Sequence, residues 1–161
     1  MSASLGSGPE SLVGFETTIL QTIAQSPDGK ASCLILDGLD FLLAATGCAV
    51  DDLLDVIYEI RTKVGRLVIT TRADASLLHS HQTPLEIAHA AFTMSVTHQA
   101  RVVMSLRELD TGAAKDISGV LRITRGGEDT EDGGKMQGLE EREYLYHVGA
   151  DGSARVFDRG S

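Results

Sequence analysis

The 161-residue sequence has no tryptophan, only three prolines and two cysteines, and no long apolar run. A membrane-spanning helix needs about 20 consecutive apolar residues, so the sequence predicts no membrane span. Two cysteines, Cys33 and Cys48, are too few for a disulfide framework or a metal site made of thiolates alone, and they favour a reducing intracellular compartment. The first residues, MSASLGSGPES, lack the basic and apolar regions of a secretory signal peptide.

Two motifs that mark catalytic sites are also missing. The phosphate-loop pattern G-x-x-x-x-G-K-[ST] occurs nowhere. Without its lysine and backbone amides, nothing in the chain is expected to hold a triphosphate. The nucleophile pattern G-x-S-x-G is absent too, so a Ser-His-Asp site has no supporting motif. We therefore expect no NTPase that works by itself, and we expect no cofactor.

Acidic residues outnumber basic ones by 23 to 14, which gives a net charge of −9. Such a chain binds nucleic acid only through a local basic surface. With three Tyr and four Phe, a stacking platform for single-stranded bases is not expected. Residues 126–141 (GGEDTEDGGKMQGLEE) hold six acids and five glycines. This composition buries too little apolar area to offset the entropy of ordering, so it predicts a mobile acidic loop.

Up to residue 107, helix patterns alternate with short apolar runs. The runs carry no polar alternation, which is typical of parallel strands buried on both faces. The order helix, strand, helix, strand, helix, strand is typical of a parallel sheet with crossover helices. Helical spacing covers 9–23, 51–64 and 84–96, and the apolar runs cover 31–37, 67–71 and 101–107. The expected central strands contain Leu34, Ile35, Leu36, Val68, Ile69, Val102 and Val103, with Ile57, Ile60 and Phe92 packed on them.

Beyond residue 119 the pattern changes to alternating apolar and polar residues. Segments 120–125, 143–148 and 153–157 alternate in this way, which predicts antiparallel strands. Asp151-Gly152 between the last two is a favoured hairpin turn. We expect an α/β fold in one domain over residues 1–161, in which an antiparallel C-terminal extension is added to the edge of the parallel sheet.

Three polar groups are candidates for function. Asp37 follows four apolar residues, as in a Walker B strand whose carboxylate orients magnesium and water at a nucleotide; alternatively the carboxylate caps the following turn. Arg72 comes directly after a predicted parallel strand, where such folds place functional loops, and a solvated arginine is the alternative. His79 and His81 offer two imidazoles, with His89 in the next helix, but metal sites usually need a third ligand with fixed geometry.

The most distinctive stretch is Thr111–Ile123, which reads T-G-x-A-K-D-x-x-G-x-L-R-I within a strand–turn–strand pattern. Together with the preceding order of strands and helices, it resembles the family of the sixth Elongator subunit over about residues 31–157. The resemblance implies a RecA-like fold with degenerate nucleotide motifs, in which Asp37 is the degenerate Walker B-like residue. The upstream strand and phosphate-loop region of that family are not found before the first helix here.

The resemblance also implies a function. It implies a subunit that is not an enzyme, has no catalytic or metal-binding residues, and forms a heterohexameric ring with Elongator's fourth and fifth subunits. The ring binds tRNA and supports modification of the wobble uridine by the catalytic Elongator subunits, in the cytoplasm and also in the nucleus. The alternative function is a small nucleotide-binding α/β domain that uses Asp37. The implied RNA-binding residues are Arg72, His79 and His81, and the implied subunit-interface residues are Arg107, Lys115 and Arg122.

Overall fold

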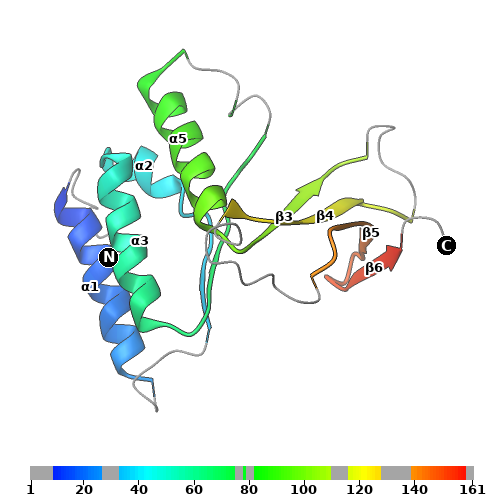
Figure 1. Ribbon diagram of the computed structural model, residues 1–161, viewed down its shortest axis with the longest axis horizontal. Helices are drawn as coiled ribbons and strands as arrows, with labels where there is room; N and C mark the ends of the chain where they lie inside the picture. Colours follow the sequence, from blue (N-terminus) through cyan, green and yellow to red (C-terminus); the bar gives the residue numbers. More distant parts are fainter. Residues whose placement is uncertain are drawn as a thin grey trace. The chain divides into compact units, whose positions relative to one another are not determined.

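A computed structural model describes residues 9–26, 33–74, 78, 82–109, 116–127 and 139–158 (Figure 1). The chain divides into two units, Met1–Val96 and Thr97–Ser161, and each is described by itself. The fold is mixed α/β, with a small parallel sheet and an antiparallel sheet. The single RecA-like domain expected from the sequence stays a prediction. In the described ranges, no helix is long and apolar enough to cross a membrane.

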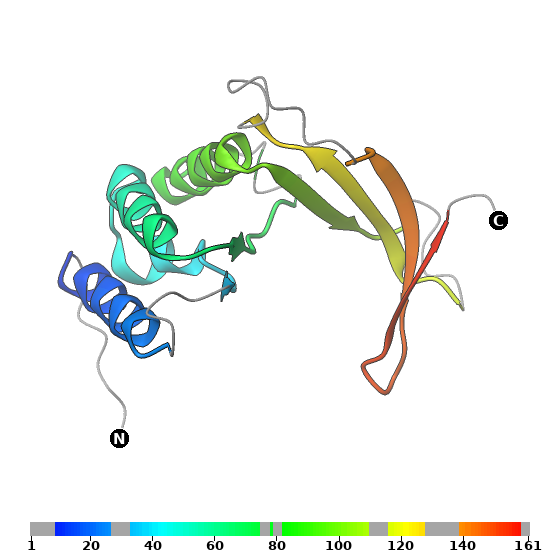
Figure 2. The same cartoon turned by 60° about the horizontal axis from the view of Figure 1, so that its bottom comes forward.

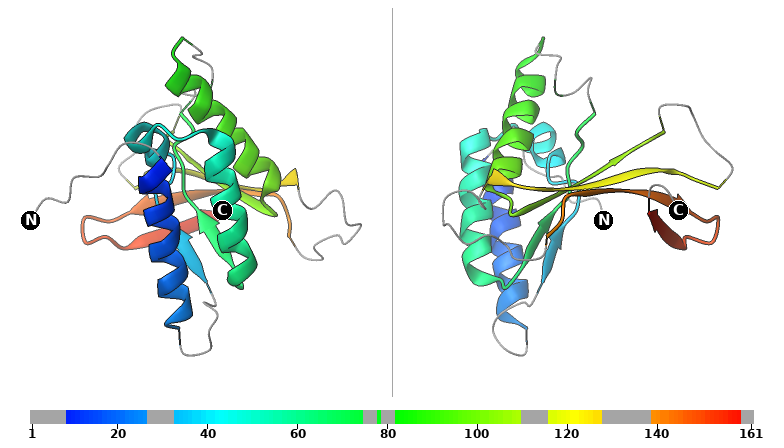
Figure 3. Two further views of the ribbon diagram at one scale, coloured as in Figure 1. Left: turned by 90° about the vertical axis from the view of Figure 1, so that its left-hand side faces the viewer. Right: turned by 45° about the vertical axis from the view of Figure 1, so that its right-hand side comes forward.

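The first unit contains a two-stranded parallel sheet and most of the helices. Helices α1 and α3 pack against each other and lie side by side in Figures 1 and 3. Strand β1 pairs with β2 in parallel, with Ile35 opposite Val68. The elements in chain order are α1 (Pro9–Ala24), β1 (Leu34–Leu36), α2 (Phe41–Thr46), α3 (Val50–Lys63), β2 (Leu67–Ile69) and α5 (Pro84–Gln99).

The helix ends follow from local chemistry. In α3, Asp51 and Asp52 occupy the first turn and Arg61 and Lys63 the last, so charges of the favourable sign face both ends of the helix dipole. At the start of α5, the Thr83 hydroxyl accepts from the Glu86 N–H at 3.2 Å, and the Glu86 carboxylate accepts from the Thr83 N–H at 2.8 Å. This is the capping box that Thr83-Pro84 and Glu86 predict.

The core of the first unit lies on one face of the parallel pair. Leu36 is buried, and Leu34, Leu67 and Ile69 pack against the same cluster. The prediction that both faces are buried is wrong, because Ile35 is 64% exposed and Val68 45%. These two residues point to the opposite face by the two-residue period of a strand. The core cluster consists of Leu12, Ile23, Leu36, Leu39, Leu43, Leu53, Val56, Ile57, Ile60 and Phe92.

The second unit is a four-stranded antiparallel sheet in the order β3-β4-β5-β6 (Figure 2). The predicted hairpin is confirmed: Gly152 has φ 78°, and the Gly149 N–H donates to the Ser153 carbonyl at 2.8 Å. The Ser153 N–H also donates to Asp151 Oδ1 at 3.0 Å, and the bonds from Ser153 lower the pKa of Asp151. The strands are β3 (Val102–Arg107), β4 (Gly119–Arg125), β5 (Arg142–Val148) and β6 (Ala154–Asp158).

One strand was assigned to the wrong sheet. Val102 and Val103 were expected in the parallel sheet, but β3 pairs antiparallel with β4, from Val102 opposite Arg125 to Arg107 opposite Val120. Its sequence VVMSLR alternates between apolar and polar residues from Met104 onward, with Ser105 and Arg107 on one face. That alternation suits an antiparallel sheet with two different faces.

Gly119 in β4 stands where no side chain fits. A Cβ there would lie 2.3 Å from the carbonyl oxygen of Arg107 and 2.8 Å from the ring of Tyr146, which is its register partner on β5. The tyrosine ring therefore covers the glycine and packs the two strands together. Gly126 and Gly127 make similarly close approaches to the backbone of Ala100 and His98.

Substitution of Leu36 should test the one-sided core. Leu36→Ala leaves a cavity and should lower the free energy of unfolding by about 2–5 kcal/mol. Ile35→Ala, on the exposed face of the same strand, is the matched control and should cost less than about 1 kcal/mol. Chemical denaturation measures both. Equal losses would show that both faces of the strand are buried.

Glycine substitutions should give effects of opposite sign in two elements. Gly119→Ala forces the Arg107 backbone and the Tyr146 ring to shift, and should destabilise the protein by about 1–3 kcal/mol. Gly14→Ala in α1 meets nothing within 4 Å, and should stabilise by about 0.5–1 kcal/mol through helix propensity. Thermal melts of both variants check the assignment, and an unchanged melt for Gly119→Ala would contradict it.

Candidate functional site

The carboxyl edge of the parallel pair is held by a hydroxyl group. The Thr70 hydroxyl, just after β2, donates to Asp37 Oδ1 at 2.5 Å and accepts from the Gly38 N–H at 2.8 Å. Gly38 has φ 64°, a conformation that favours glycine. The Asp37 carboxylate is thus joined to the turn after β1 through the Thr70 hydroxyl, and its Walker B-like role stays a prediction.

A buried polar pair lies next to this turn. Asp40, at the N-cap of α2, has Oδ2 3.4 Å from His89 Nε2 on α5, and each side chain is only 11% exposed. The pair connects α5 to the turn after β1. The contact could not be predicted from sequence, because no local sequence pattern indicates that two residues so far apart in the chain lie close together. In the parts of the chain that the structure describes, no three side chains are grouped as metal ligands.

Arg72 extends from the same edge. It is exposed and follows Thr70, which is bonded to the turn after β1, and Thr71, whose hydroxyl lies 3.4 Å from that of Thr93 on α5. The arginine therefore directly follows two threonines whose hydroxyls contact neighbouring elements, and its functional role stays a prediction. His79 and His81, predicted beside it, lie outside the described residues.

The antiparallel sheet carries arginines on one face. In the strand register, Arg122 lies opposite Ser105 on β3 and Glu143 on β5, and Arg155 lies opposite His147. Alternation along each strand places Arg107, Arg122, His147 and Arg155 on this face, here called the arginine face. Sequence analysis named only Arg107 and Arg122. The other two could have been found by pairing residues outward from the Asp151-Gly152 turn. Lys115, predicted with them, lies outside the described residues.

Exposed apolar residues gather on the opposite face of the same sheet, which also carries Arg125 and Arg142. Met104 and Leu106 on β3 and Val156 on β6 are exposed there, and Tyr144 and Tyr146 on β5 are half-buried. Residues of these types, contiguous on one face, are typical of a protein–protein contact. The sheet therefore presents two surfaces of different chemistry.

The described ends of the acidic segment bind to this unit. The Arg125 N–H donates to Glu141 Oε1 at 3.0 Å and its guanidinium donates to the Leu139 carbonyl at 3.1 Å. Arg142 pairs with Glu140, and this hydrogen bond raises the pKa of Arg142. At the other end, the Gly126 N–H donates to the Arg101 carbonyl at 2.9 Å. The acidic loop predicted over 126–141 lies mostly outside the described residues.

The family comparison covers both units. A family model described as Elongation complex protein 6 matches residues 8–149. The chain belongs to this family. It is therefore an Elongator subunit, as the resemblance of Thr111–Ile123 implied. A comparison with curated proteins found no match.

A double-mutant cycle should test the structural role of Asp37. Asp37→Ala and Thr70→Val should each lower the free energy of unfolding by about 1 kcal/mol, and the double variant should lose less than the sum because both remove the same bond. Thr62→Val is the control, since the Thr62 hydroxyl bonds to Glu59 in its own helix. Its effect should add to that of Asp37→Ala. Strict additivity for Asp37 and Thr70 would refute the contact.

Proposed function

We propose that this Elongator subunit is not an enzyme. It assembles with the fourth and fifth subunits in a ring of RecA-like subunits, which binds tRNA and supports wobble-uridine modification by the catalytic subunits. The match of the family model over residues 8–149 is the observation that carries this proposal. The site of action is the cytoplasm, with the nucleus as a second location.

The non-catalytic role rests on Asp37 and on the sequence. The Asp37 carboxylate is engaged by Thr70, and the chain has no phosphate-loop motif that would bring a triphosphate to it. The parallel β1–β2 pair with its connecting helices is compatible with part of a RecA-like sheet.

Two surfaces are suited to RNA. Arg72 leaves the carboxyl edge of the parallel pair, and the arginine face lies on the antiparallel sheet. Among the described residues, neither Arg122 nor Arg155 forms an ion pair, so both are available to phosphate groups. Phosphate contacts by a few arginines allow an acidic chain to bind RNA locally.

The apolar face of the antiparallel sheet is better suited to a neighbouring subunit. Met104 and Leu106 are exposed there, and their side chains are apolar. Covering them with another protein removes this apolar surface from water, which is favourable. The expectation that Arg107, Lys115 and Arg122 contact neighbouring subunits stays as the alternative assignment of the two faces.

Reconstitution with the fourth and fifth subunits tests this division. Arg122→Glu with Arg155→Glu should leave assembly intact and weaken tRNA binding by about tenfold or more at low salt, with a smaller loss at high salt. Arg72→Glu should act in the same direction. Met104→Asp should instead impair assembly, as measured by size-exclusion chromatography with light scattering. Unchanged tRNA affinity in all three arginine substitutions would contradict the RNA surfaces.

The alternative, a nucleotide-binding domain, has a direct test. Calorimetry with Mg-ATP should show no saturable binding to the chain, alone or in the assembly. Micromolar binding that is lost in Asp37→Ala would support the alternative and refute the proposed non-catalytic role.

A further inference from the structure

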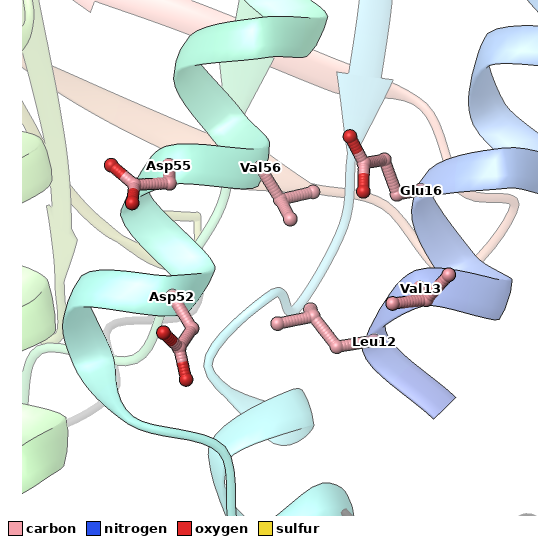
Figure 4. A pocket seen from close by; sticks show the side chains of 6 residues that line it. All are labelled: Leu12, Val13, Glu16, Asp52, Asp55 and Val56. Atoms are coloured by element: carbon pink, nitrogen blue, oxygen red, sulfur yellow. The ribbon is translucent and has the colours of Figure 1, made fainter. Parts of the chain in front are cut away.

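A groove lies between α1 and α3. None of its lining residues belongs to the candidate RNA-binding or subunit-contact surfaces described above. It has a volume of about 280 Å³ and takes three lining residues from each helix. Figure 4 shows Leu12 and Val56 pointing into the space between the helices, with the carboxylates of Glu16 and Asp52 beside it. The lining residues are Leu12, Val13, Glu16, Asp52, Asp55 and Val56.

The floor of the groove is apolar and part of it stays open to solvent. Leu12 and Val56 belong to the buried core, whereas Val13 is 57% exposed. An exposed Val13 beside an apolar floor distinguishes this surface from an ordinary solvated helix face.

The rim of the groove is acidic and uncompensated. Helix α1 contains no lysine or arginine, and the basic residues of α3 lie in its last turn. Within the described ranges, Glu16, Asp52 and Asp55 form no ion pair, although Glu59 on the same helix pairs with Lys63 at 3.1 Å. Glu16 and Asp52 therefore place two carboxylates beside the apolar floor, whereas the carboxylate of Asp55 lies on the side of α3 away from α1 (Figure 4).

We propose that this groove receives an arginine-bearing segment of a partner protein. An arginine side chain lays its apolar stem on Leu12 and Val56, while its planar guanidinium donates to carboxylates of the rim. The negative rim repels RNA, and it repels a second copy of itself in a two-fold contact. The proposal does not rest on RNA binding, which uses the arginines of other surfaces.

The first experiment uses the full chain, labelled with ¹⁵N, and a synthetic helical peptide. The peptide carries two arginines one turn apart beside a leucine, and its twin carries citrulline, the neutral isostere, in place of arginine. Chemical shifts of α1 and α3 residues around the groove should change with the arginine peptide. The citrulline peptide should bind about tenfold more weakly, and added salt should weaken binding of the arginine peptide.

Two variants with the same net charge locate the site. Glu16→Gln should weaken peptide binding by about fivefold or more, whereas Glu59→Gln, which makes the same change on α3 outside the groove, should change it less than about twofold. Circular dichroism and thermal melts establish that both variants fold. The proposal is overturned by equal effects of the two variants, by equal binding of both peptides, or by no shift changes at millimolar peptide.

The second experiment places the photo-cross-linker benzoylphenylalanine at Val13 in the reconstituted assembly. The expected product joins Val13 to a partner segment that contains arginine, and glutamate in place of that arginine should abolish it. Glu16→Arg should restore the cross-link to the glutamate variant. A cross-link to tRNA, to a second copy of this chain or to a segment without basic residues overturns the proposal. None of these outcomes affects the tests of assembly and tRNA binding.

Discussion

The hydroxyl group of Thr70 connects the parts of the first unit on which the other features depend. Strands β1 and β2 have three residues each, too short for an isolated pair to be stable. The Thr70 hydroxyl joins their carboxyl ends by bonding both Asp37 and Gly38. The turn so formed leads to Asp40, which contacts His89 on α5. The Thr70 contact thus joins the turn that leads to α2 and the segment that carries Arg72, and Asp40 in that turn approaches α5.

Features set by neighbouring residues were predictable from sequence. Apolar spacing located α1, α3 and α5, the Thr83 and Glu86 side chains located the start of α5, and Asp151-Gly152 located the last hairpin. Features set by distant partners were not. An apolar run gives no sign of whether one or both of its faces are covered, so Ile35 was wrongly placed in the core. For the same reason β3 was assigned to the parallel sheet.

The candidate site was partly predictable for the same reasons. Arg72 lies at the carboxyl edge because its place in the chain, directly after a strand, already fixes that position. Recognising the arginine face requires the register of four strands. Sequence gives the register only next to the Asp151-Gly152 turn, where it places Arg155 opposite His147, and it does not relate that hairpin to Arg122 on β4. The contact between Asp40 and His89 joins elements 49 residues apart in the chain, and neither residue type by itself indicates a partner.

The charge of −9 is divided among surfaces rather than spread evenly. Among the described residues, Arg72, Arg122 and Arg155 form no ion pair, and neither do Glu16 and Asp52 beside the groove of the first unit. A polyanion is attracted to the first kind of surface and repelled by the second, and a basic peptide behaves in the opposite way. Local surfaces of opposite sign therefore allow one acidic chain to favour different kinds of partner, and an Elongator subunit can contribute specificity through the sign of its local charge.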